Sequence, residues 1–181
     1  ITALRAEPDG RLWIGSYGGG LQFAPAASRR AGEFWPLTAL PWGERRVESR
    51  FIWALDRTDG DLRIGTGHGL LSWSDRDARL RDVDAGVASV RSLLDLGQGT
   101  RLVGTMFGLY REHDGRLDRI ALTAPGELPT AAQAIWSLAR WDDEIWAGSG
   151  GGLWCLGEDL EVRARVEVGT EAGQLPGPVV W

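Results

Sequence analysis

Four copies of one pattern run through this chain of 181 residues. Each copy opens on an aliphatic residue and continues with a small residue and a leucine. A glycine followed by serine or threonine comes later, and a glycine-leucine pair closes the copy. The leucines are Leu4, Leu55, Leu93 and Leu138, which lie 51, 38 and 45 residues apart. A period in this range is typical of the blades of β-propellers.

Three columns of the pattern recur in every copy. The aliphatic openers are Ile1, Ile52, Val90 and Ile135. The glycine-hydroxyl pairs are Gly15-Ser16, Gly65-Thr66, Gly104-Thr105 and Gly148-Ser149. The closing pairs are Gly20-Leu21, Gly69-Leu70, Gly108-Leu109 and Gly152-Leu153. Because these residue types repeat, we interpret them as parts of the shared scaffold.

Each copy is expected to form four short strands, which in the first copy cover residues 1–6, 11–16, 20–24 and 33–37. Alternating apolar residues fit the two-residue period of a strand. Asp9-Gly10 and Asp59-Gly60 lie between the first two strands and are strong hairpin signals. No stretch carries a helical period with caps, so we predict an all-β chain.

The predicted fold is a β-propeller of four four-stranded blades at about residues 1–50, 51–88, 89–133 and 134–178. One four-stranded sheet cannot bury both faces, and stacked blades hide them. A fifth repeat is expected to start at 179–181, because Val180-Trp181 follows Leu175-Pro176 as Ile135-Trp136 follows Leu128-Pro129. We therefore expect part of a larger ring of about seven blades, with a closed four-bladed ring as the alternative. The tryptophans expected to fill the gaps between blades are Trp13, Trp146 and Trp154.

At these residues the chain resembles the two-component regulator propeller repeat. DGRLWIGSYGGGL at residues 9–21 is similar to that repeat throughout, and Arg63 replaces its tryptophan in DGDLRIGTGHGL. TRLVGTMFGL lacks the tryptophan and the Asp-Gly turn, and DEIWAGSGGGL has Asp142-Asp143 at that turn. The resemblance covers nearly the whole chain. It implies a periplasmic sensor region of a bacterial inner-membrane protein whose output domain, a histidine kinase or a diguanylate cyclase in a phosphorelay, lies outside this chain.

Composition and charge exclude several classes of function. The net charge is −5, so no basic surface is available for nucleic acid. No stretch approaches the roughly 20 apolar residues that span a bilayer, so a membrane is expected only through parts outside this chain. Cys155 is the one cysteine, which excludes intrachain disulfides. His68 and His113 are expected at opposite ends of a blade, so we predict no metal and no cofactor.

Catalytic residues are not expected in this segment. Ser16 and Ser149 do not match the G-x-S-x-G nucleophile motif, and their recurrence predicts a hydroxyl bonded to backbone at a strand end. Asp9, Asp59 and Asp114 precede glycine, which turn geometry explains better than acid catalysis. We interpret Cys155 as a small core residue.

A binding site is expected on the face that carries the turns between second and third strands and the connections between blades. Function usually lies on such loops. The candidate turn residues, which do not repeat between copies, are Tyr17, His68, Met106 and Phe107. The candidate arginines of the first connection are Arg45, Arg46 and Arg50. Aromatic rings with arginines suit a sugar, an aromatic acid or an acidic peptide.

Three functions stay open at this stage. The first is a ligand-sensing module for an unknown small molecule such as a carbohydrate, in a parent protein that forms a homodimer. The second is a propeller that mediates protein–protein contact without a small ligand. The third is a secreted polysaccharide-active propeller, which would need paired carboxylates that we do not find in the pattern.

Overall fold

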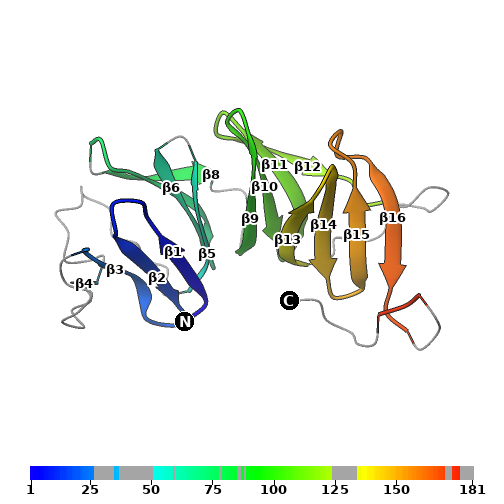
Figure 1. The fold of residues 1–181 in the computed structure, drawn as a ribbon, viewed down its shortest axis with the longest axis horizontal. Helices are drawn as coiled ribbons and strands as arrows, with labels where there is room; N and C mark the ends of the chain where they lie inside the picture. Colours follow the sequence, from blue (N-terminus) through cyan, green and yellow to red (C-terminus); the bar gives the residue numbers. More distant parts are fainter. Residues whose placement is uncertain are drawn as a thin grey trace. The chain divides into compact units, whose positions relative to one another are not determined.

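The computed structural model describes residues 1–26, 35–36, 51–58, 60–77, 79–84, 87, 89–123, 134–169 and 173–175. These residues form sixteen β-strands and contain no helix (Figure 1). The described residues therefore include no helical segment that could cross a membrane. The chain divides into two compact units, Ile1–Val90 and Arg91–Trp181.

The first unit holds two four-stranded antiparallel sheets, each built from strands that are consecutive in the chain. The first sheet contains β1 (Ala3–Ala6), β2 (Leu12–Ser16), β3 (Gly20–Ala24) and β4 (Trp35–Pro36). The second sheet contains β5 (Ile52–Thr58), β6 (Asp61–Thr66), β7 (Gly69–Ser74) and β8 (Arg79–Asp84).

The second unit repeats this arrangement. Its first sheet contains β9 (Val90–Gly97), which starts at the last residue of the first unit, with β10 (Thr100–Thr105), β11 (Gly108–His113) and β12 (Arg116–Ile120). Its second sheet contains β13 (Ile135–Trp141), β14 (Glu144–Ser149), β15 (Gly152–Leu156) and β16 (Val162–Glu167). The prediction of four four-stranded blades in an all-β chain is confirmed. The predicted fifth repeat at 179–181 lies outside the described residues.

Tight turns close two hairpins of the third blade. Asp114 and Gly115 have φ values of 49° and 76°, and Gln98 and Gly99 have 52° and 70°. Two successive positive φ values define the type I′ turn, whose twist matches that of the flanking strands. Asp114-Gly115 therefore acts as a turn, as its sequence predicts.

The first junction, where the sheet β1–β4 packs on the sheet β5–β8, is apolar at its centre. Trp13 is 1% exposed and lies in a cluster with Leu21, Ile52, Leu62 and Ile64. A Cβ built on Gly15 would lie 2.6 Å from Ile52 Cγ2, so only glycine lets the isoleucine sit on the backbone of β2. The repeated glycine column thus serves contact with the next blade.

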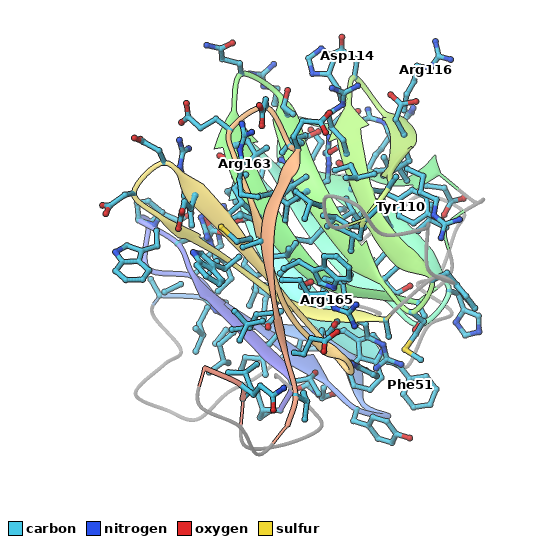
Figure 2. The ribbon with its side chains drawn as sticks, turned by 90° about the vertical axis from the view of Figure 1, so that its right-hand side faces the viewer. Phe51, Tyr110, Asp114, Arg116, Arg163 and Arg165 are labelled. Atoms are coloured by element: carbon cyan, nitrogen blue, oxygen red, sulfur yellow. The ribbon has the colours of Figure 1, made fainter. Side chains whose placement is uncertain are left out.

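The second junction, between the sheet β9–β12 and the sheet β13–β16, uses the same positions. Leu102 and Leu109 are fully buried against Ile135, and a Cβ on Gly104 would lie 2.8 Å from Ile135 Cγ2. Trp154 is fully buried in the same cluster. Arg165, which is labelled in Figure 2, has its guanidinium carbon 4.9 Å from the ring centroid of Trp154.

Two of the three tryptophans predicted to fill gaps between blades do so. Trp13 and Trp154 are buried, at 1% and 0% exposure. Trp146, which occupies the same repeat position as Trp13, is only half-buried, and its Nε1 donates to Glu144 Oε2 at 3.2 Å. Cys155 is buried in β15, as predicted, and burial raises the pKa of its thiol.

One buried ion pair replaces an apolar pair of the repeat. Arg101 of β10 and Glu112 of β11 are paired in register, are 2% and 1% exposed, and form a salt bridge. The equivalent pairs in the second and fourth blades are Leu62 with Trp73 and Ile145 with Leu156. A charge in this position is tolerated because its partner lies directly opposite.

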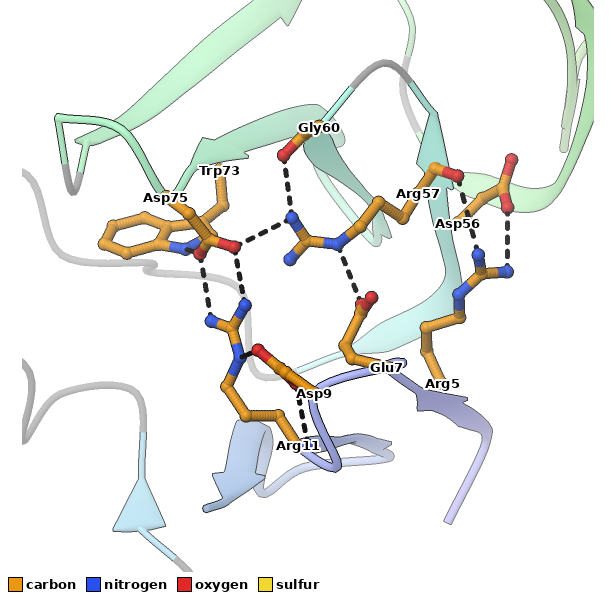
Figure 3. Close-up of polar contacts among 9 residues, drawn as sticks. All are labelled: Arg5, Glu7, Asp9, Arg11, Asp56, Arg57, Gly60, Trp73 and Asp75. Atoms are coloured by element: carbon orange, nitrogen blue, oxygen red, sulfur yellow. Dashed lines mark hydrogen bonds and ion pairs between the residues drawn. The ribbon is translucent and has the colours of Figure 1, made fainter. Parts of the chain in front are cut away.

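Polar side chains cross the first junction at the end of β5 (Figure 3). Arg57 bonds Glu7 Oε1 at 2.8 Å and Asp75 Oδ2 at 2.9 Å. Arg11 also bonds Asp75, at 2.7 Å, and Arg5 contacts Asp56 at 3.3 Å. The hydrogen bond from Arg11, with that from Trp73 and the charge of Arg57, lowers the pKa of Asp75 to about 2. This end of the first unit is held by ion pairs.

Candidate ligand-binding rim

All four blades hold the turn between their second and third strands in the same way. The hydroxyl that ends the second strand donates to the carbonyl oxygen of the glycine that begins the third. The pairs are Ser16–Gly20 at 3.0 Å, and Thr66–Gly69, Thr105–Gly108 and Ser149–Gly152 at 2.9 Å. The predicted role of these hydroxyls is confirmed, and it gives Ser16 and Ser149 a structural function.

Three aromatic rings gather at this end of the first unit. Tyr17, in the turn between β2 and β3, is 69% exposed. Its ring centroid lies 4.8 Å from that of Phe51 and 5.5 Å from that of Trp53. Phe51 and Trp53 are nearly parallel, with centroids 6.3 Å apart and planes at 14°. We call Tyr17, Phe51 and Trp53 the aromatic platform.

Backbone pairing fixes the aromatic platform. Tyr17 and Phe51 form an isolated antiparallel bridge, which joins the turn of one blade to the first strand of the next. Figure 2 shows Phe51 at the lower end of the view. The predicted proximity of this turn to the start of the next blade is thus confirmed in the first unit.

Trp53 lies in a β-bulge of β5. The register of β5 on β6 passes from Ile52 opposite Thr66 to Ala54 opposite Gly65, so Trp53 is the extra residue. Bulges redirect a side chain at the edge of a sheet and are common next to functional sites. The same bulge recurs in β13, where Trp136 is the extra residue between Ile135 and Ser137.

The turn that carries His68 is hydrogen-bonded to the backbone of Phe51, a member of the aromatic platform. His68 is exposed, and its backbone N–H donates to Thr66 Oγ1 at 3.1 Å. The preceding residue, Gly67, donates to the carbonyl oxygen of Phe51 at 2.9 Å. Phe51 therefore connects the turns that carry Tyr17 and His68, which are two of the predicted site residues.

Two further predicted site residues lie in the second unit. Phe107 is 57% exposed in the turn between β10 and β11 of the second unit, beside the half-buried Met106. Arg119 Nη2 donates to the carbonyl oxygen of Phe107 at 3.4 Å. Arg45, Arg46 and Arg50 lie outside the described residues.

An arginine–tryptophan contact marks the corresponding rim of the second unit. The guanidinium of Arg91 lies 5.2 Å from the ring centroid of Trp136. Arg91 and Trp136 hold the same repeat position in neighbouring blades as Trp53 does in the second blade. In the last three copies, the position directly after the aliphatic opener therefore carries an aromatic or cationic group, whereas the first copy has Thr2 there.

The described residues hold no group of three or more histidine, cysteine or carboxylate side chains that could bind a metal ion. His113 lies at the end of β11, where its Nδ1 is 2.9 Å from Thr100 Oγ1. Asp114 and Arg116 follow at the same turn (Figure 2). Asp9 accepts hydrogen bonds from the backbone and side chain of Arg11, at 3.0 and 2.7 Å, and the backbone bond lowers its pKa.

Sequence reasoning missed Phe51 and Trp53. Phe51 stands where the other copies have Ser89 and Ala134, so a large ring at a variable position was one available signal. The sequence pattern predicts Trp53 to be an ordinary strand tryptophan, because the bulge that redirects it has no sequence signature. Tyr17 is predicted correctly to lie at this end of the blade because its turn position differs between copies.

No protein-family model and no curated protein matches this chain. Solved structures do match it. The extracellular domain of a hybrid two-component system from B. thetaiotaomicron has a TM-score of 0.77 at 19% identity, over 99% of this chain and 24% of that one. A second such domain from the same organism has a TM-score of 0.71 at 20% identity, over 98% of this chain and 23% of that one.

The same fold also occurs in an enzyme. An ancestral GH74 enzyme has a TM-score of 0.63 at 11% identity, over 85% of this chain and 22% of that one. Identities this low show a shared fold, which many functions use. The chain spans about a quarter of the length of each of these three proteins.

Proposed function

We propose that this chain is a non-catalytic, ligand-sensing propeller module of a bacterial membrane-bound signalling protein, and that it acts outside the cytoplasm. Its likeness to the extracellular domains of two hybrid two-component systems supports this role. The repeat resemblance supports it independently. In this proposal the output domain, a histidine kinase or a diguanylate cyclase, lies outside the chain, and the parent protein forms a homodimer.

The aromatic platform is the observation that carries the binding role. Its rings lie 4.8 to 6.3 Å apart and fill the space between one another, so the platform offers an outer ring surface rather than a cage. Tyr17 is exposed, whereas Phe51 and Trp53 are half-buried, so the platform presents part of its ring surface to solvent at the end of a sheet, where loops often carry function. We propose a small molecule with an apolar ring face, such as a carbohydrate, as the ligand, with His68 as a polar neighbour.

Calorimetry with an oligosaccharide panel and the intact chain tests this proposal. For any oligosaccharide that binds, Tyr17→Ala should weaken the affinity by about tenfold, or about 1.4 kcal/mol. Trp141→Ala removes another exposed ring, at 68% exposure, and should leave the affinity unchanged. Equal losses in the two variants, or none in Tyr17→Ala, would remove the platform as the site.

A protein partner is the second candidate, because exposed aromatic side chains are also common anchors of protein interfaces. In that case the panel gives no binding. Tyr17→Ala then weakens association between this chain and the periplasmic regions of its parent protein in sedimentation experiments.

A further inference from the structure

We infer that the aromatic platform and the ion pairs at the other end of β5 are energetically coupled, so that a ligand on the platform tightens the first junction. The role of the ligand rests on the proposed function, whereas the coupling itself is a property of the chain alone. It gives the first unit a way to convert binding at the rim into a change of packing between two blades.

The aromatic platform is shared between the two blades of the first unit. Tyr17 comes from the turn between β2 and β3, whereas Phe51 and Trp53 come from the start of the second blade. The ring centroid of Tyr17 lies 4.8 Å from that of Phe51 and 5.5 Å from that of Trp53. A ligand that contacts all three rings therefore contacts both blades, and it binds the closed junction better than an open one.

Contacts with the first blade occur at both ends of β5. Near the rim, Thr2 Oγ1 donates to the carbonyl oxygen of Ile52. At the other end, Arg57 Nε bonds Glu7 Oε1 at 2.8 Å (Figure 3). An extended strand rises about 3.3 Å per residue, which separates these two contacts by about 17 Å. One continuous strand therefore carries both ends of the junction.

Gly15 fixes the spacing of the two blades beside the platform. A Cβ built on Gly15 would lie 2.6 Å from Ile52 Cγ2, and Ile52 is fully buried there. Packing this close leaves no slack for sliding. Because Ile52 stands between Phe51 and Trp53 in the chain, a movement that lifts Ile52 off Gly15 also separates these rings from Tyr17.

Contacts at two ends of one interface reinforce each other. Once the platform holds the rim, the groups at the other end are kept close together, which raises their effective concentration. The pair formed by Glu7 and Arg57 is sensitive to this, because their side chains are only 3% and 13% exposed. The reverse effect has the same size, since the coupling between two sites is reciprocal.

Tyrosine resonances test the coupling in the full chain with its platform intact. Tyr17 and Tyr110 are the two tyrosines, so ¹³C-labelled tyrosine gives two sets of ring signals, which Tyr110→Phe assigns. The ring currents of Phe51 and Trp53 displace the signals of Tyr17. Glu7→Gln breaks the ion pair at the other end of β5 and should reduce this displacement.

Glu158→Gln is the matched control, because it makes the same change in the exposed pair with Arg140 in the second unit. It should leave the signals of Tyr17 in place, and the signals of Tyr110 report whether the second unit stays folded. Unchanged Tyr17 signals in Glu7→Gln would overturn the coupling. Ligand binding at the platform would still be decided separately, by calorimetry with the oligosaccharide panel.

Hydrogen exchange tests the reverse direction and covers a Glu7→Gln variant that does not fold. Tyr17→Ala should raise exchange about fivefold or more in residues 5–11, which lie at the ion-pair end. Phe107→Ala removes an exposed ring from the corresponding turn of the third blade and should not change exchange there. No rise in residues 5–11 would exclude the coupling. A rise of equal size throughout residues 1–90 would show a general loss of stability in its place.

Discussion

The junctions inside the two units share a scaffold and differ in how their ends are held. In both, a glycine of the second strand receives the opener of the next blade, Ile52 or Ile135. At the first junction, ion pairs from Arg57 and Arg11 cross between the blades. In the second unit, the ion pairs Arg101–Glu112 and Arg140–Glu158 each lie within one blade.

The difference teaches which part of the repeat sets blade packing. Columns near the sheet centre are apolar or glycine in both junctions, and burial there supplies the contact energy. Residues at the sheet ends are free to become ion pairs or aromatic groups. We therefore expect the first junction to depend on pH and the second to depend mainly on apolar packing.

The largest expected effect lies at the centre of the first junction. Trp13→Ala should destabilise the first unit by about 3–5 kcal/mol, because it leaves a cavity between two blades. Hydrogen exchange followed by mass spectrometry should show faster exchange in residues 1–90. The control Trp141→Ala, at an exposed site, should change stability by less than about 0.5 kcal/mol. Similar values for the two tryptophans would break the comparison.

Glu7 provides the next test, because it is 7% exposed and bonds Arg57 across the first junction. Glu7→Gln leaves Arg57 without this charge partner and should cost about 2 kcal/mol. Glu158→Gln removes the exposed pair with Arg140 in the second unit and should cost less than about 0.5 kcal/mol. Thermal unfolding measures both. A larger loss in Glu158→Gln would show that the ends of the two units are held alike.

Asp75 sharpens the comparison through pH. Its pKa is about 2 in the folded chain against an ordinary value of 3.8. The resulting stability is complete above the ordinary value and is lost as the pH falls toward 2. Asp75→Asn should cost about 1 kcal/mol at neutral pH, since the carboxylate is partly exposed.

Denaturant titrations of the unaltered chain and of Asp75→Asn from pH 6 to pH 2 measure the contribution of the Asp75 carboxylate. The free energies of unfolding of the two proteins should converge at the acid end. A constant difference over the whole range would contradict the ion-pair account.

The smallest expected effect concerns Arg91, which lies over Trp136 at the second junction. Arg91→Met keeps most of the apolar stem and removes the cation, so the loss should be about 0.5–1 kcal/mol. This loss should not vary between pH 4 and pH 6. A pH-dependent loss would place ionic coupling at the second junction too.

Much of the fold could be predicted because the same sequence pattern recurs in four copies. The hairpin turn at Asp114-Gly115, the buried Trp13 and the hydroxyl of Thr66 all follow from local patterns that recur. The burial of Arg101 and Glu112 could not be predicted, because two charged residues eleven positions apart read as surface until strand register pairs them.

The candidate rim was only half predictable for a similar reason. Tyr17 and His68 were visible as exceptions within a repeating turn. Trp53 depended on a bulge, which arises from the pairing of two strands and not from the sequence of either one.

The four identical hydroxyl-to-glycine bonds have a consequence for how such rims diversify. Each turn is anchored by the residue before it and by the glycine after it, whose φ is positive in all four blades, at 72°, 141°, 131° and 128°. The side chains between these anchors, such as those of Tyr17 and Met106, take no part in these hydrogen bonds. Mutation can therefore rewrite what the surface recognises, one blade at a time, while the architecture beneath stays intact.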